Sequence, residues 1–124
     1  MNAVAQVLAG LVGLMLIIVG ILESFFYRNP RFRGIFLIEP KDAAAVRLWV
    51  VNVGWYNMLS GVGVLVALVL VNAGNVDAGR AIVWFVCACH LVLGVTLVIS
   101  EPRLWKSTIA ESGVPLATMV ALLF

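Results

Sequence analysis

The stretch Ala3–Leu22, AVAQVLAGLVGLMLIIVGIL, decides the fold of this chain, because it is long and apolar enough to cross a lipid bilayer. Gln6 is its one break. In hydrocarbon every backbone polar group must be paired within the segment, so a run of about 20 apolar residues predicts a spanning helix. The run lacks the basic flank and the small-residue cleavage site of a signal peptide, so we expect it to remain as a membrane anchor.

The composition of the whole chain agrees with a membrane location. Hydrophobic residues make up 64% of the 124 residues and charged residues 11%, whereas soluble domains carry about 25% charged residues. An ordinary soluble domain is therefore excluded. No low-complexity tract or long linker divides the chain, so we expect a single transmembrane domain over residues 1–124.

Further apolar segments follow the first one and predict an all-α integral membrane bundle of four transmembrane helices, over about residues 3–24, 42–71, 81–99 and 104–124. In the last of these only residues 114–124 are continuously apolar, too few to cross alone, so this helix must begin upstream. Either Pro102 starts it as a first-turn proline, or Thr108 and Glu111 start it as a capping box. Pro115 is expected to kink either version.

The basic residues predict the orientation. Arg80 lies on one side of the predicted membrane, and the other seven lie on the opposite side: Arg28, Arg31, Arg33, Lys41, Arg47, Arg103 and Lys106. By the positive-inside rule these loops face the cytoplasm, which places the N- and C-termini on the extracytoplasmic side of a plasma (inner) membrane protein with several passes. The net charge of +2 reflects this topology and gives no reason to expect nucleic-acid binding.

Polar residues inside the second predicted helix form two stripes. Asn52 and Tyr56 are four residues apart and share one stripe, whereas Gly54, Asn57 and Gly61 share another about 100° away. Amide groups that face lipid cost several kcal/mol. We therefore expect both stripes to face protein.

Depths follow from the helical rise. At about 1.5 Å per residue from the cytoplasmic ends, Glu23 lies at the interface, and Asn57 and His90 lie near the midplane, about 14 to 15 Å deep. We predict a polar pocket that opens to the cytoplasm and binds its ligand through Glu23, Asn52, Tyr56, Asn57 and His90. The alternative is that these residues only form interhelical hydrogen bonds, each worth about 0.6 to 2 kcal/mol. Glu111 is assigned to the capping box.

Small residues predict close helix packing. Ala9, Gly13 and Gly20 lie along the first helix, and Gly54 and Gly61 along the second. Such residues let two helices approach closely, so we interpret them as packing faces.

The segment between residues 28 and 47 is the longest outside the predicted membrane. In it Phe32, Ile35, Phe36 and Ile38 alternate with charged residues, which predicts a connector lying on the membrane surface. A gate or a docking surface is the alternative.

Catalytic, metal and cofactor chemistry have little support. Cys87 and Cys89 point about 200° apart on a helix, so they do not form a two-thiol redox motif. His90 is the only histidine, which argues against haem or zinc. No nucleotide loop or nucleophile motif is present, so we expect no cofactor, and enzymatic activity has little support from the sequence.

Three sequence elements together resemble a known family: Glu23-x-Phe25; Pro30-Arg31-x-Arg33-x-x-Phe36; and Asn52-x-Gly54-x-Tyr56-Asn57 with Gly61 following. The chain resembles the small bacterial membrane proteins catalogued as Domain of Unknown Function family thirteen-oh-four. The resemblance is clearest over the first two helices and their loop, and Gly113-x-Pro115 fits more loosely. It implies a four-helix membrane fold and no assigned activity.

Three functional classes are open at this point. The polar residues favour a protein that binds or transports a small or lipidic molecule, whereas the glycine faces suit a non-catalytic accessory or assembly subunit of a larger membrane complex. A lipid-modifying enzyme has the least support, because only Glu23, Tyr56 and His90 could supply acid–base chemistry. The expected partners are the lipid bilayer, a small-molecule or lipid ligand, and either a second copy of the chain or a larger complex.

Overall fold

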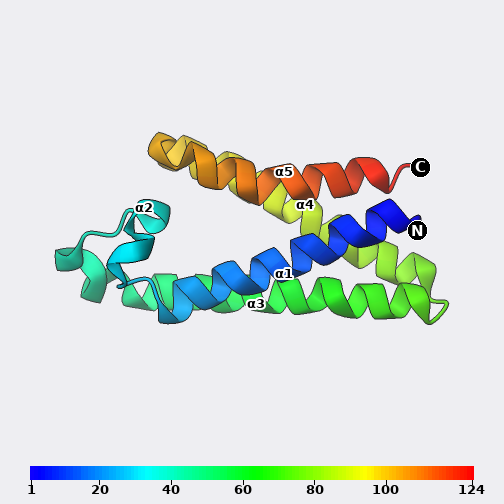
Figure 1. Cartoon of the computed structure of the whole chain (residues 1–124), viewed down its shortest axis with the longest axis horizontal. Coiled ribbons are helices and arrows are strands. Elements are labelled where there is room, and N and C mark those ends of the chain that lie inside the picture. The colour runs from blue at the N-terminus through cyan, green and yellow to red at the C-terminus, as the bar shows by residue number, and fades with distance from the viewer.

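The computed structural model describes residues 1–124, and all its regular structure is helical. Four long helices run antiparallel to their neighbours in the chain (Figure 1): α1 (Ala3–Phe25), α3 (Ala43–Asn72), α4 (Val76–Ser100) and α5 (Trp105–Ala121). Short helical segments join them: η1 (Pro30–Phe32), α2 (Arg33–Phe36), η2 (Pro40–Asp42) and η3 (Pro102–Leu104). The all-α prediction is confirmed. The third long helix begins at Val76, earlier than the predicted residue 81, and Asp77 in its first turn suits the positive end of the helix dipole.

Three segments are long and apolar enough to cross a membrane: α1, η2 with α3 (Pro40–Asn72), and α4. Large apolar side chains cover the outside of the molecule, and Trp49, Phe85 and Ile99 are each more than 70% exposed. Such an exterior suits lipid, and the chain has the character of a membrane protein. Helix α5 has 17 residues, or about 26 Å, and is not among the three.

Glycines bring α1 and α3 into backbone contact at two levels. A Cβ added at Gly54 would lie 2.7 Å from the carbonyl oxygen of Gly20, and one added at Gly61 would lie 2.5 Å from the carbonyl oxygen of Gly13. Both distances are too short for any side chain other than hydrogen. The predicted glycine faces are confirmed, and they pack against each other.

The two helix pairs α1–α3 and α4–α5 meet at the end of the molecule that holds both chain termini (Figure 1). There Asn2 Nδ2 donates a hydrogen bond to the carbonyl oxygen of Ala121, 2.7 Å away. The apolar core lies toward this end and consists of small and medium side chains: Ala5, Ala9, Val12, Leu16, Val64, Ala67, Val83, Cys87 and Leu122. Toward the other end α1 and α5 diverge (Figure 1).

The start of the fourth long helix decides between the two predicted versions. Pro102 opens η3, which runs directly into α5, whereas Thr108 lies inside α5. The capping box is therefore not formed, and the proline start is correct. Glu101 caps the turn instead, because its Oε1 accepts a hydrogen bond from the backbone N–H of Arg103 over 3.2 Å.

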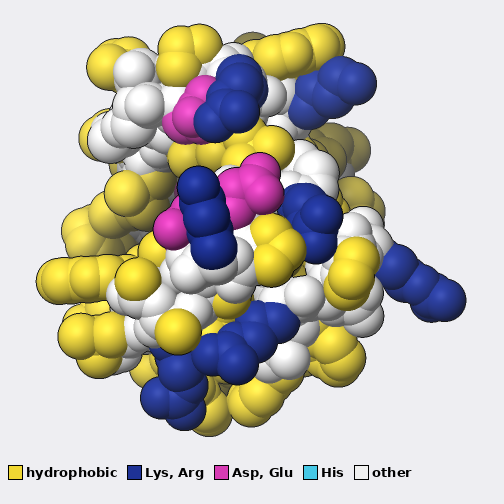
Figure 2. Space-filling model, turned by 90° about the vertical axis from the view of Figure 1, so that its left-hand side faces the viewer, with side chains coloured by type: hydrophobic (Ala, Val, Ile, Leu, Met, Phe, Trp, Pro, Cys, Tyr) yellow, Lys and Arg dark blue, Asp and Glu magenta, His cyan; other side chains and the backbone are white.

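Charged side chains gather at the end of the molecule opposite the chain termini, where the connector between α1 and α3 and the segment η3 lie; we call this the loop end. Figure 2 faces this end and shows lysines and arginines around a smaller acidic group. Seven of the eight basic residues belong to the loops and helix ends on this side, whereas Arg80 lies near the start of α4. The charge asymmetry used to predict the orientation is thus a property of the folded molecule.

Candidate functional site

A cavity of about 500 Å³ lies at the loop end of the bundle. Its polar residues are Glu23, Asn57, Lys106, Ser107 and Glu111. Its apolar residues come from all four long helices and from the segments before α3 and α5: Met15, Leu16, Val19, Ile35, Phe36, Ile38, Val50, Leu97, Leu104 and Ala110. The cavity is therefore an apolar chamber with a few polar groups, which is typical of small-molecule sites.

Glu23 and Asn57 form the closest polar pair in the cavity. Asn57 Nδ2 donates a hydrogen bond to Glu23 Oε2, 2.7 Å away. Gly20 faces Gly54 where α1 crosses α3. Glu23 lies three residues after Gly20 on α1, and Asn57 lies three residues after Gly54 on α3. Because the helices are antiparallel, the two residues are on opposite sides of the crossing. Helical side chains tilt toward the N-terminus of their own helix. In an antiparallel pair both tilts lead back to the crossing, so the two side chains meet there.

This geometry changes the predicted position of Glu23. Counting along the helix predicts that Glu23 lies at the interface, whereas its carboxylate turns into the bundle and lines the cavity. Asn57 also lines the cavity, and its hydrogen-bond partner is Glu23.

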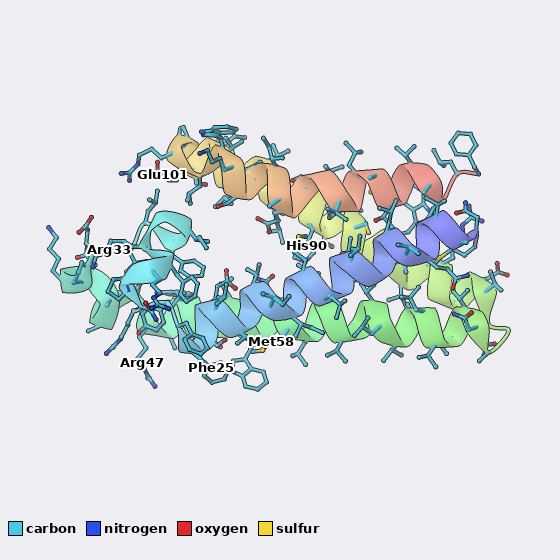
Figure 3. The ribbon with its side chains drawn as sticks, in the orientation of Figure 1. Phe25, Arg33, Arg47, Met58, His90 and Glu101 are labelled. Atoms are coloured by element: carbon cyan, nitrogen blue, oxygen red, sulfur yellow. The ribbon has the colours of Figure 1, made fainter.

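His90 is 3% exposed and lies between the two helix pairs (Figure 3). Its Nδ1 is 3.4 Å from Oε1 of Glu111, whose side chain is 26% exposed. The distance is long for a hydrogen bond, so the pair is looser than Glu23 with Asn57. His90 reaches the cavity through Glu111, which is one of the lining residues.

Sequence reasoning missed Glu111 as a site residue, because the capping box accounted for it. Since α5 begins at Trp105, Glu111 lies well inside the helix with its side chain free for the cavity. Pro115 is buried four residues later and has no N–H to donate to the carbonyl oxygen of Glu111. The spacing of Glu111 and Pro115 was the one signal in the sequence that could have pointed to Glu111 as a site residue, because the proline leaves the carbonyl oxygen of Glu111 without its helical hydrogen-bond donor.

The connector between α1 and α3 covers one side of the cavity. Ile35 and Phe36, at the end of α2, and Ile38 after it line the chamber. Leu37 between them has a φ of 53°, a left-handed conformation that ends the short helix and turns the chain. These side chains were expected on the membrane surface, whereas the structure places three of the four against the cavity.

Asn52 and Tyr56 lie on the outer face of α3. Asn52 is exposed, and its Nδ2 donates to the carbonyl oxygen of Leu48 in its own helix over 2.7 Å. Tyr56 is 72% exposed. The structure therefore brings together Glu23, Asn57 and His90 with Glu111, and it does not bring Asn52 or Tyr56 to them. Their stripe faces outward, where a protein-facing position was expected.

The remaining charge at the cavity belongs to Lys106. Its side chain is exposed, and its Nζ lies 5.5 Å from the centroid of the Trp105 ring. It forms no ion pair with either glutamate. No group of three or more His, Cys, Asp or Glu side chains is arranged to hold a metal ion. The cavity wall thus carries two carboxylates, one amide, one hydroxyl and one ammonium group among apolar side chains, and the imidazole of His90 lies against Glu111.

A family model described as Protein of unknown function (DUF1304) matches residues 10–123. No curated protein and no solved structure matches the chain.

Proposed function

We propose that this chain, which belongs to the family described as Protein of unknown function (DUF1304), binds a small amphipathic molecule inside the membrane. The observation that carries the proposal is the apolar cavity of about 500 Å³ with the Glu23–Asn57 and Glu111–His90 pairs at its wall. Pockets for small molecules hold about 300 to 1,000 Å³ and combine apolar walls with a few polar groups.

The shape of the cavity fits an amphipathic ligand. Its wall on α1 reaches from Met15 to Glu23, eight residues or about 12 Å of helix. The apolar body of a ligand would lie against Met15, Val19 and Leu97, and its polar group would reach the glutamates. Ile35 and Phe36 would close over it, which makes the connector the gate of the site.

The distribution of basic residues determines the orientation that we propose for the site. We propose that α5, extended by η3, is a fourth crossing, so that both termini lie on the extracytoplasmic side and the cavity opens toward the cytoplasm. The location of seven basic residues at the cavity end supports this orientation in a plasma membrane.

The accessory-subunit hypothesis needs the glycine faces free for a partner. Gly13, Gly20, Gly54 and Gly61 are used between α1 and α3 instead. The glycine faces that suggested an accessory subunit therefore pack within the chain and are not free for a partner. Ligand binding has the stronger support.

The experiment compares two tryptophan variants at adjacent positions of α1. Val19 lines the cavity, whereas Ile18 is 57% exposed on the outside. The probes are decanol, decylamine and decanoate, titrated into protein in lipid nanodiscs, with empty nanodiscs as the blank. We expect at least one probe to bind the unchanged protein and Ile18→Trp, and Val19→Trp to lose that binding. Equal uptake by Val19→Trp, or no uptake of any probe by the unchanged protein, would overturn the proposal.

A further inference from the structure

We infer that the ligand of this cavity is a monovalent organic cation, such as a primary ammonium with an apolar body, and that it binds in exchange for one proton on Glu23. The inference rests on the proposed function and adds the chemical class of the ligand. It follows from the number of charged groups at the cavity and from the partner of each one.

The two glutamates differ in their partners. Glu111 has the imidazole of His90 beside it, with Nδ1 of His90 3.4 Å from its Oε1. Glu23 has only the amide of Asn57, a hydrogen-bond donor without charge. Glu23 is therefore the one acid in the cavity that has no basic side chain paired with it.

No neighbouring element supplies a basic side chain that pairs with Glu23. At the cavity wall α3 contributes Asn57, α4 contributes Leu97, and the connector contributes the apolar Ile35 and Phe36, whereas His90 of α4 lies against Glu111. On α5 the charged residues are Glu111, which adds negative charge, and Lys106, whose ammonium group lies by the Trp105 ring.

The nearest basic residue along the chain from Glu23 is also engaged elsewhere. Arg28 donates from Nε to the hydroxyl of Tyr27 over 2.9 Å and packs over its ring, and Tyr27 donates in turn to the carbonyl oxygen of Ala43. A cationic ligand is thus the group that the site lacks.

An unpaired carboxylate in apolar surroundings is disfavoured relative to its neutral acid, and a cation beside it reverses that preference. The step is a simple exchange. The O–H bond of the Glu23 carboxylic acid breaks, its proton leaves to water, and the carboxylate that remains pairs with the ammonium group of the ligand. Asn57 holds Oε2, so Oε1 is the oxygen free to accept from the ammonium group.

The test counts protons. Decylammonium chloride is titrated calorimetrically into protein in nanodiscs, at one pH, in buffers of different ionisation enthalpy. We expect release of one proton per bound cation from the unchanged protein and from Glu111→Gln. Glu23→Gln, which keeps a hydrogen-bonding partner for Asn57, should release none and bind at least about tenfold more weakly.

A measurement on the unchanged protein does not depend on any variant. Over the acidic range in which Glu23 holds its proton, the affinity for decylammonium should rise about tenfold per pH unit, as one-proton linkage requires. Binding of decylammonium without proton release, or proton release that disappears in Glu111→Gln and persists in Glu23→Gln, would overturn the inference.

Comparing decanol, decanoate and decylammonium separates a failure of this inference from a failure of the proposed function. If decanol or decanoate binds and decylammonium does not, the cavity binds ligands and the inference on charge is wrong. If none of the three binds, the proposed function itself fails.

Discussion

Gly20 on α1 and Gly54 on α3 lie back to back, so that a Cβ on either residue would collide with the carbonyl oxygen of the other. Gly13 and Gly61 repeat the contact seven residues away on each helix. The spacing of seven keeps both contacts on one face of each helix. This crossing also sets the register that brings Glu23 to Asn57, and it therefore connects the packing of the bundle to the composition of the cavity.

Replacing Gly20 by alanine should weaken the bundle. The added Cβ meets Met58 and the backbone of α3, so the helices must separate, at a cost of about 1 to 3 kcal/mol. Thermal unfolding in mild detergent measures the change. The control is Gly63→Ala, a helical position with open space around it, where alanine should raise stability by up to about 1 kcal/mol. Equal effects of the two variants would contradict the role of the crossing.

Replacing Asn57 by leucine should destabilise the protein, because Oε2 of Glu23 would lose its one hydrogen-bond donor. A buried acceptor left without its partner costs about 1 to 3 kcal/mol. Asn52→Leu is the matched control on the same helix, where the side chain is exposed and bonds only its own backbone. Its effect should stay within about 0.5 kcal/mol. If Asn52→Leu were the more damaging change, the outward placement of that stripe would be wrong.

The sequence predicted the helices better than the site. Long apolar runs predict α1, α3 and α4 directly, and the small residues predict which faces of α1 and α3 meet. What it did not predict is that only one of the two polar stripes of α3 faces inward. Asn57 shares its stripe with Gly54, and the crossing at Gly54 turns it to the cavity, whereas the stripe of Asn52 faces outward.

Glu111 shows a second limit of the sequence. A threonine and a glutamate at capping-box spacing are equally consistent with a helix start and with a helix interior. The structure selects the interior, because Pro102 opens a turn that leads directly into α5. Thr108 Oγ1 is then buried without a hydrogen-bond partner, and Glu111 is left to line the cavity.

The two polar pairs of the cavity should differ in coupling energy. A double-mutant cycle with Glu23→Ala and Asn57→Ala should give about 1 kcal/mol, within the range for interhelical hydrogen bonds in membranes. A cycle with His90→Gln and Glu111→Ala should give less, because the atoms are 3.4 Å apart against 2.7 Å. Unfolding free energies in one detergent provide both cycles. A larger value for the His90 pair would show that distance does not rank these interactions.

Glu101, which lies outside the membrane, should have a low pKa because it pairs with Arg103. The side-chain hydrogen bond from Arg103, at 2.8 Å between Nη2 and Oε2, lowers the pKa of Glu101 to about 2. Because the folded pKa lies below the ordinary value of 4.5, the interaction is complete above about pH 4.5 and is lost as the pH falls toward 2.

The test of this pair is a carboxyl NMR titration. Arg103→Gln should return the pKa of Glu101 toward 4.5, whereas Arg47→Gln, at a site without an ion pair to Glu101, should leave it low. A pKa of Glu101 that stayed low in Arg103→Gln would mean that the arginine is not the cause.

The proposed orientation predicts which side of the membrane each loop can be labelled from. A cysteine at Gly34, in the connector that covers the cavity, should react with a membrane-impermeant maleimide only in inverted vesicles, because the proposed orientation puts this end, with its seven basic residues, in the cytoplasm. A cysteine at Ala73, in the turn between α3 and α4, should react only from the outside of intact cells. Both variants are made with Cys87 and Cys89 replaced by serine. Labelling of both positions from the same side would mean that the chain does not cross the membrane between them, so that α3 is not a spanning helix. If instead Gly34 were labelled only from outside and Ala73 only in inverted vesicles, the protein would have the opposite orientation and its cavity would open to the outside.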